Sequence, residues 1–159
     1  MSEILPGIYV GNASTARDAE FFSKQNIVKV VNCTPDLPFY FPNDVECLRI
    51  PVYDADDVKN NAIMTRALPK AVSFILQDPV PSVNRGVLIH CHAGISRSCT
   101  VAVAVLRVCC ARSLRHAISL CLSRRPIAFF GGTVINFWRA LETVFHPDRI
   151  NNDSRFLQA

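Results

Sequence analysis

The sequence predicts a single α/β domain, with a central and mainly parallel β-sheet of about four to five strands flanked by helices on both faces. Short runs of β-branched and apolar residues alternate along the chain with longer segments in which apolar residues recur at helical spacing. The chain has 159 residues, a length that suits one domain with its own hydrophobic core. Ligands bind such sheets at the carboxyl ends of the strands, so functional residues are expected there.

The first half of the chain is expected to contain three strands and one helix. Ser14 or Thr15 can cap that helix, because a hydroxyl can accept a hydrogen bond from a backbone N–H of the first turn. The loop before the third strand holds three prolines and is therefore expected to be irregular. In order, the predicted elements are a turn and short strand at 3–11, a helix at about 14–24, a strand at 27–33, the irregular loop at 34–43 and a strand at 47–52.

The second half is expected to be mainly helical around one buried strand. Pro69 either starts or kinks the first of these helices. The predicted elements are a polar loop at 53–61, a helix through 68–76, a connection at 78–85, a strand at 87–89, a buried helix at 100–110, a helix capped by Ser113 that ends at Arg124-Arg125-Pro126, a loop at 129–132 and a last helix capped by Thr133. The domain is expected to cover residues 1–147, with a short C-terminal tail at 148–159.

The stretch from Val87 to Ser98 reads as strand, tight loop and helix, and the rest of the chain is organised around it. A loop in this position presents backbone N–H groups at a helix N-terminus, where the positive end of the dipole binds anions. Successive amides that point into one concavity make a nest for a phosphate. The expected phosphate-binding loop consists of Cys91, His92, Ala93, Gly94, Ile95, Ser96 and Arg97.

Cys91 and Arg97 are the candidate nucleophile and the candidate phosphate-binding side chain of this loop. The helix dipole and the loop amides favour the thiolate form of Cys91, which is the nucleophilic form. The planar fork of Arg97 can hold two phosphate oxygens and offset the charge of a transition state. Together they predict phosphoryl transfer to an in-line thiolate. A nucleotide-binding loop would need a Gly-Lys-Ser/Thr ending, and a redox pair would need a second cysteine at position 94, which is Gly.

The run His-Cys-x-Ala-Gly-Ile-Ser-Arg-Ser at 90–98 resembles the signature of the dual-specificity branch of the cysteine-dependent protein tyrosine phosphatases. The resemblance covers nearly the whole chain, through Ser-Glu-Ile-Leu-Pro-x-Ile-Tyr-Val-Gly at 2–11, Ile-Pro-Val-x-Asp at 50–54 and Ser-Arg-Arg-Pro at 123–126. It implies a protein tyrosine phosphatase-like fold. It also implies hydrolysis of phosphotyrosine and phosphoserine or phosphothreonine through a phosphocysteine intermediate, with no cofactor and no metal. The length is similar to that of the small, single-domain atypical members.

The resemblance also implies a general acid. In the family, the acid is an Asp on the loop that follows the Ile-Pro-Val-x-Asp segment, which is Asp54 in this chain. A positioned carboxylic acid can protonate the leaving oxygen. Asp57 and then Asp56 remain as alternatives, because Asp54 lies slightly farther from Cys91 along the sequence than the resemblance leads us to expect.

Several other residues near the loop receive expected roles. His90 is implied to order the loop and to favour the thiolate. Ser98 can hydrogen-bond the Cys91 sulfur as it leaves the phosphoenzyme, or it can cap the helix. His92 is expected to face solvent. Cys33 ends the strand expected beside the one that leads to Cys91, so it is either a redox partner of Cys91 or, as we favour, an inert buried thiol.

Two further sequence features concern the surroundings of the loop. Family members often carry a Pro-Asn pair whose Asn braces the loop, and here Phe129-Phe130-Gly131-Gly132-Thr133 stands in its place. The brace is therefore expected to be missing or replaced. A basic cluster is expected to form a solvated face, and it consists of Arg112, Arg115, His116, Arg124 and Arg125.

Composition restricts the expected partners and location. The net charge of +4 fits phosphorylated protein substrates and is too weak to argue for nucleic acid. No long apolar run predicts a membrane segment. Seven cysteines without Cys-x-x-Cys spacing indicate free thiols in a reducing compartment, so a cytoplasmic monomer is expected, with the nucleus as an alternative location. Two other functions stay open: the same chemistry on a phosphoinositide, glycan phosphate or RNA 5′-phosphate, and a non-catalytic phosphopeptide-binding module.

Overall fold

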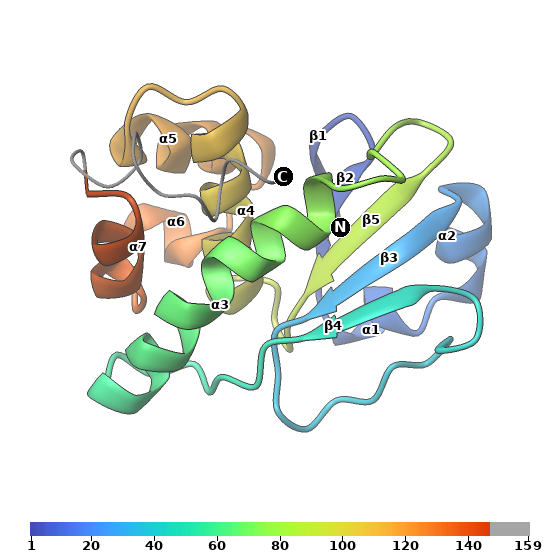
Figure 1. Cartoon of the computed structure of the whole chain (residues 1–159), viewed down its shortest axis with the longest axis horizontal. Helices are drawn as coiled ribbons and strands as arrows, with labels where there is room; N and C mark the ends of the chain where they lie inside the picture. The colour runs from blue at the N-terminus through green and yellow to red at the C-terminus, as the bar shows by residue number, and fades with distance from the viewer. Residues whose placement is uncertain (147–159) are drawn as a thin grey trace.

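Five strands form one sheet at the centre of the computed structural model, which describes residues 1–146 (Figure 1). The order in the sheet is β1-β2-β5-β3-β4. Only the outermost pair, β1 with β2, is antiparallel, and the other three pairs are parallel, which confirms the predicted fold class. The strands are β1 (Ser2–Leu5), β2 (Ile8–Gly11), β3 (Ile27–Asn32), β4 (Glu46–Arg49) and β5 (Gly86–His90).

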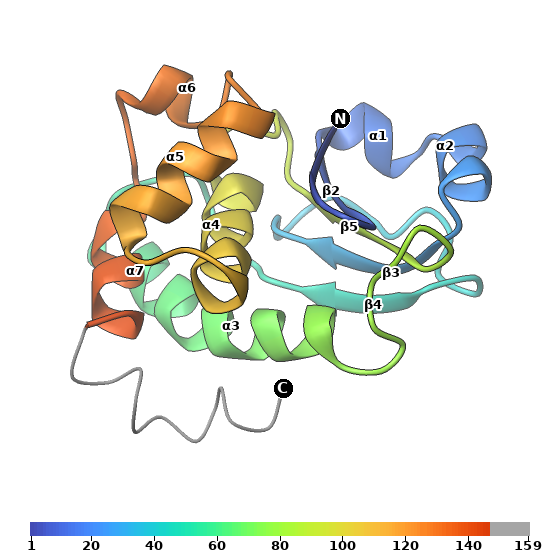
Figure 2. The same cartoon turned by 90° about the horizontal axis from the view of Figure 1, so that it is seen from above.

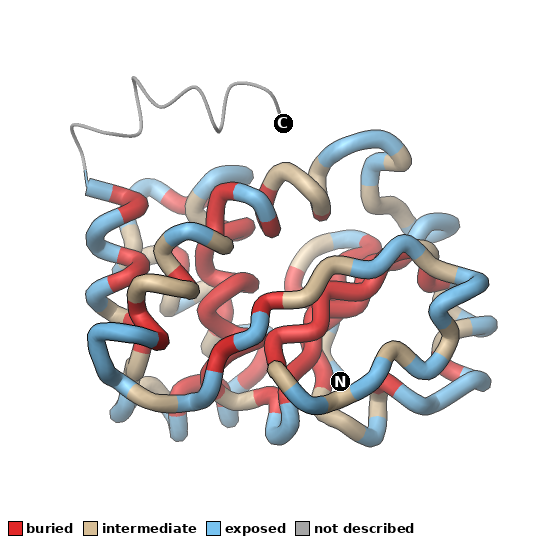
Figure 3. The backbone as a smooth tube through the Cα atoms, turned by 60° about the horizontal axis from the view of Figure 1, so that its bottom comes forward, coloured by how far each residue is buried: buried red, intermediate tan, exposed pale blue. Residues whose placement is uncertain are grey.

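Helices cover both faces of this sheet, as Figure 2 shows for α1 and α2 on one side and α3 on the other. The helices are α1 (Ala13–Ala16), α2 (Ala19–Lys24), α3 (Val58–Leu76), α4 (Arg97–Cys109), α5 (Leu114–Arg124), α6 (Phe129–Gly132) and α7 (Trp138–Val144). The central strand β5 is buried along its whole length (Figure 3). Its Leu88 packs in the cluster with Phe21, whereas Val87 and Ile89 face the larger cluster of α3 and α4. A parallel strand covered on both faces is expected to be apolar throughout.

The single N-terminal helix predicted at 14–24 is wrong, because the segment forms two short helices. Asn12, rather than Ser14 or Thr15, caps α1: its Oδ1 accepts from the backbone N–H of Thr15 at 3.0 Å. Asp18 then caps α2 by accepting from the N–H of Phe21 at 3.1 Å. A carboxylate that binds an amide in this way starts a new helix and ends the one before it.

The polar loop predicted at 53–61 is shorter than expected, because α3 already begins at Val58. Asp57 caps this helix by accepting from the N–H of Asn60 at 2.7 Å. Pro69 therefore lies inside the helix and does not start it. Before this loop, β4 ends at Arg49 rather than at residue 52, and Pro51, which has no N–H to donate to a strand ladder, lies just beyond it.

Of the helices after the phosphate loop, α4 and α5 agree with the expectation, whereas the loop expected at 129–132 forms the short helix α6. Ser113 caps α5 by accepting from the N–H of His116 at 3.1 Å, as expected. The last helix, however, begins at Trp138 rather than just after Thr133. Thr133 does not cap it, because its hydroxyl donates to Phe130 O at 2.9 Å instead. The tail expected at 148–159 lies outside the described residues.

Candidate active site

The candidate residues gather at the edge of the sheet where the parallel strands end. The register places Gly11 of β2 and Asn32 of β3 beside His90 of β5. Cys91 follows β5 directly, and α4 begins six residues later at Arg97. The short loop between them therefore lies at the N-terminus of α4, as the sequence predicted.

The Cys91 sulfur is held at the base of this loop. The residue is buried, with 2% of its surface exposed. Its Sγ accepts from the backbone N–H of Gly94 at 3.2 Å and lies 3.2 Å from the Ser98 Oγ. Gly94 has φ +67°, a backbone conformation that opposes a Cβ, and an added Cβ would also collide with the Gly11 carbonyl.

Three carbonyl groups of the loop are tied to the surrounding protein. The carbonyl of His92 accepts from the N–H of Ala13 at 2.9 Å, and that of Ile95 accepts from the N–H of Phe129 at 2.7 Å. The carbonyl of Gly94 accepts from the Nε of Arg125 at 2.7 Å. In a trans peptide the N–H that follows a carbonyl points the opposite way. With these three carbonyls bound outward, the amides of residues 93, 95 and 96 are the candidates for the expected anion nest.

Arg125 is a functional residue that the sequence analysis missed. We expected it on a solvated basic face, but only 5% of it is exposed. Its Nη1 also donates to the Ser2 Oγ at 2.9 Å, so it joins the N-terminal hairpin to the loop. Its only signal in the sequence is its place in the Ser-Arg-Arg-Pro run. The neighbouring Arg112, Arg115 and Arg124 are exposed, as expected.

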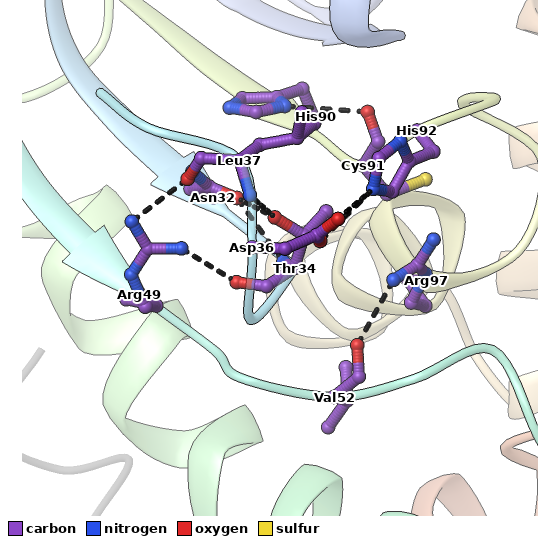
Figure 4. A network of polar contacts seen from close by, with 10 residues as sticks. All are labelled: Asn32, Thr34, Asp36, Leu37, Arg49, Val52, His90, Cys91, His92 and Arg97. Carbon is purple, nitrogen blue, oxygen red and sulfur yellow. Dashed lines mark hydrogen bonds and ion pairs between the residues drawn. The ribbon is translucent and has the colours of Figure 1, made fainter.

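Arg97 is buried at the first turn of α4 and is aimed toward the segment after β4. One amino group, Nη1, donates to Val52 O at 3.0 Å, a contact visible in Figure 4. Its Nε is buried and has no hydrogen-bond partner among the described residues. A buried donor without a partner is costly, and a phosphate oxygen in the nest would satisfy it.

His90 is fully buried directly before the nucleophile. Its Nδ1 lies 3.4 Å from the Cys91 carbonyl oxygen. Burial lowers the pKa of the His90 imidazole to about 4, so the ring is neutral near pH 7. The expected effect of this residue on the thiolate therefore comes from its contact with the backbone and not from a positive charge.

The structure gives the three candidate acids different surroundings. Asp57 caps α3, and the hydrogen bond from the Asn60 backbone holds the pKa of its carboxyl below the usual range. Asp56 accepts from the Asn61 amide at 2.9 Å. Asp54 is exposed and lies two residues after Val52, the residue that binds Arg97. The first two carboxylates serve the start of α3, so Asp54 is the candidate that the arrangement favours.

Two polar contacts near the site were not expected from the sequence. The Asn136 side-chain amide donates to Asp54 Oδ1 at 2.9 Å. His92 is exposed, as expected, but its Nε2 lies 3.0 and 3.1 Å from the two carboxylate oxygens of Asp36 (Figure 4). In the segment where a Pro-Asn brace was expected, the Phe129 backbone donates to the loop, and Asn136 contacts the acid candidate.

Cys33 lies beside the strand that leads to Cys91. Its N–H donates to His90 O at 2.8 Å, and its side chain is fully buried. Burial raises the pKa of the Cys33 thiol well above its ordinary value, so it stays protonated. A protonated, buried thiol fits the inert interpretation better than that of a redox partner.

Comparison with known proteins agrees with this geometry. The family model described as dual specificity phosphatase, catalytic domain, matches residues 8–144. Human dual specificity protein phosphatase 9 is 37% identical over 145 residues, which are 87% of this chain and 36% of that protein. The Drosophila melanogaster phosphatase Mpk3 is 38% identical over 127 residues, 78% of this chain and 29% of the relative.

Solved structures show the same fold at lower identity. The crystal structure of DUSP15 has a TM-score of 0.75 at 24% identity and covers 99% of this chain and 93% of its own. The crystal structure of human DUSP28 has a TM-score of 0.72 at 24% identity. The match covers 90% of this chain and 94% of the DUSP28 chain. The chain spans about a third of the length of the curated relatives it matches. None of the helices within residues 1–146 has the length and apolar character needed to cross a membrane. On the family match and these identities, the chain belongs to the dual specificity phosphatase family.

Proposed function

We propose that this chain hydrolyses phosphotyrosine and phosphoserine or phosphothreonine in proteins through a phosphocysteine intermediate. One observation carries the proposal: the buried Cys91 sulfur accepts from the Gly94 amide at the base of a short loop that ends at the buried Arg97. A dianionic phosphate in this nest would sit directly over a nucleophile. The family to which the chain belongs supports phosphorylated proteins as the substrate class.

In the first step, the Cys91 thiolate attacks phosphorus from the side opposite the leaving group. The S–P bond forms while the bond from phosphorus to the substrate oxygen breaks. The nest amides and the Arg97 guanidinium bind the three non-bridging oxygens, where the transition state carries its charge. Asp54, in its protonated form, gives its proton to the leaving oxygen.

In the second step, water attacks the phosphorus of the phosphocysteine. Asp54, now a carboxylate, accepts the proton from that water as the P–O bond forms. The S–P bond breaks and returns the thiolate of Cys91. The hydroxyl of Ser98 and the N–H of Gly94, each 3.2 Å from the sulfur, stabilise it as it leaves.

Activity on both kinds of phosphoresidue requires a shallow pocket, and three of the aromatic residues that could deepen it pack elsewhere. Phe41 packs against Phe22 of α2, with ring centroids 4.7 Å apart. Phe39 stacks under the Arg49 guanidinium at 5.0 Å. Phe129 is fully buried in the main core. These placements support a low rim over Cys91, which a phosphothreonine can reach as well as the longer phosphotyrosine.

The first experiment measures hydrolysis of p-nitrophenyl phosphate in the presence of EDTA. Turnover by wild type and its loss in Cys91→Ser are expected, whereas a binding module would turn over nothing. A panel of phosphotyrosine and phosphothreonine peptides, phosphoinositides, a phosphoglycan and RNA with a 5′-phosphate then identifies the substrate class. A higher kcat/KM for a non-protein phosphate than for every peptide would show that the substrate is that phosphate and not a protein. A preference for phosphotyrosine beyond about 10⁴-fold, roughly 5.5 kcal/mol of discrimination, would overturn the dual specificity.

A further inference from the structure

The turn that follows β3 is fixed beside the phosphate loop by side chains of the sheet (Figure 4). Arg49, the last residue of β4, donates from Nη1 to Thr34 O and from Nη2 to Leu37 O, both at 2.8 Å. Asn32, the last residue of β3, donates to the same Leu37 carbonyl at 2.8 Å. The Oδ1 of Asn32 also accepts from the N–H and the hydroxyl of Thr34, at 3.1 and 2.8 Å. This turn is therefore in place before a substrate arrives.

The fixed turn carries Asp36 to the rim of the phosphate loop. Both carboxylate oxygens of Asp36 lie within 3.1 Å of the His92 Nε2. The Asp36 side chain is 63% exposed and that of His92 43%, so the pair borders solvent where a substrate would approach. The hydrogen bond from His92 holds the pKa of the Asp36 carboxyl below its usual range, so this carboxylate is ionised.

Two other charged groups lie near this rim, Arg97 at the start of α4 and Arg49 at the end of β4. The Arg97 guanidinium binds the substrate phosphate in the proposed reaction. The Arg49 guanidinium is engaged by the Thr34 and Leu37 carbonyls and lies over the Phe39 ring. The exposed carboxylate of Asp36 is therefore the charge left to meet a residue beside the phosphorylated one.

We propose that Asp36 is a specificity-determining residue that favours phosphopeptides with a lysine or arginine beside the phosphorylated residue. The proposal rests on the proposed phosphatase activity and adds a substrate class to it. The contact with His92 holds the carboxylate at the rim of the phosphate loop, where it can pair with a cation of the substrate.

The expected effect is modest and measurable. A unit charge about 7 Å from another in water changes binding by about 2- to 3-fold, so replacing a flanking Lys with Glu is expected to cost about 5- to 10-fold. Because the effect arises between exposed charges, added salt should reduce it.

The test compares two phosphotyrosine peptides that differ only in a Lys or a Glu next to the phosphotyrosine. We expect the ratio of their kcat/KM values to favour Lys by at least about 5-fold at low salt. Asp36→Asn should bring the ratio close to unity, and Asp36→Glu should keep the wild-type ratio.

Asp44→Asn serves as the matched control. Asp44 is an exposed carboxylate in the same connection, but it precedes β4 and so lies at the opposite end of that strand, about 13 Å or more from the site edge. Its variant should retain the wild-type ratio. A wild-type ratio within 2-fold of unity, or one that Asp36→Asn leaves unchanged, would overturn the proposal. Hydrolysis of p-nitrophenyl phosphate separates this outcome from failure of the proposed function, because an active enzyme with no Lys preference refutes only the role of Asp36.

Discussion

The replacement Arg125→Met tests whether the phosphate loop depends on support from outside its own sequence. Methionine keeps an unbranched apolar stem and removes both donors, the Nε bonded to Gly94 O at 2.7 Å and the Nη1 bonded to Ser2 Oγ at 2.9 Å. Two hydrogen bonds from a charged donor contribute roughly 3–6 kcal/mol together. Part of this loss is offset, because burying the Arg125 charge costs free energy and no described carboxylate pairs with it. We expect a net loss of about 2–3 kcal/mol, which lowers Tm by roughly 5–10 °C in a domain of this size.

The same replacement should reduce catalysis at temperatures where the variant is folded. Without its partner, the Gly94 carbonyl no longer holds the next amide toward the phosphate. Loss of one preorganised donor costs up to about 10²–10³ in rate, and a loosened donor should cost about 10- to 100-fold in kcat/KM. The assay is p-nitrophenyl phosphate turnover together with thermal unfolding. Arg124→Met, at the exposed neighbouring position, is the control. If Arg125→Met matches Arg124→Met in both measurements, the supporting role of Arg125 is refuted.

The remaining predictions concern the reacting groups and pH. Cys91→Ser should bind a phosphopeptide in a calorimetric titration but turn over less than about 1% as fast as wild type, because serine is not ionised near neutral pH. Arg97→Lys should also be severely impaired in kcat/KM, since a point charge cannot replace the bidentate fork. Asp54→Asn should lower kcat/KM by about 10²-fold for substrates with a poor leaving group and by much less for activated esters. If Asp57→Asn shows this pattern and Asp54→Asn does not, Asp54 is not the acid. Because the folded pKa of His90, about 4, is below the unfolded value, wild-type stability should fall as pH drops from about 6.5 toward 4, by up to about 3 kcal/mol. In urea titrations at several pH values, the free energy of unfolding of His90→Gln should lack this part of the dependence on pH.

The parts of the site that could be predicted from sequence are contiguous along the chain. Cys91, Gly94 and Arg97 lie on one loop between one strand and one helix, so their spacing almost determines their geometry. The fold class was predicted for a similar reason, because each strand and helix carries its own periodicity. The mainly parallel order of the sheet then places the carboxyl ends of the strands, and with them the loop, at one edge.

The parts that could not be predicted join residues far apart along the chain. Arg125 lies 31 positions from the Gly94 that it supports, and Asp36 lies 56 positions from His92. An arginine in a basic run carries no sign of whether it is buried, so the expectation of a solvated face was reasonable for its neighbours and wrong for Arg125. Asp57 shows a related ambiguity, because an Asp near a helix start can serve as a cap or as an acid. Only the contact with Asn60 distinguishes these roles.

The phosphate loop is preorganised by the protein around it more than by its own residues. Its three tied carbonyls bind the start of α1, the residue after α5 and the start of α6, which are three segments from both halves of the chain. Each bond fixes one peptide group of the loop, so the loop backbone is held in place before a phosphate binds. In the segment where the family's Asn brace was expected, the Phe129 backbone supplies a donor to the Ile95 carbonyl. A backbone donor places few demands on the side chain at its position. Replacement of the Pro-Asn pair by Phe129-Phe130-Gly131-Gly132-Thr133 is therefore compatible with an intact nest, and variation at this segment should affect the rim of the pocket more than its base.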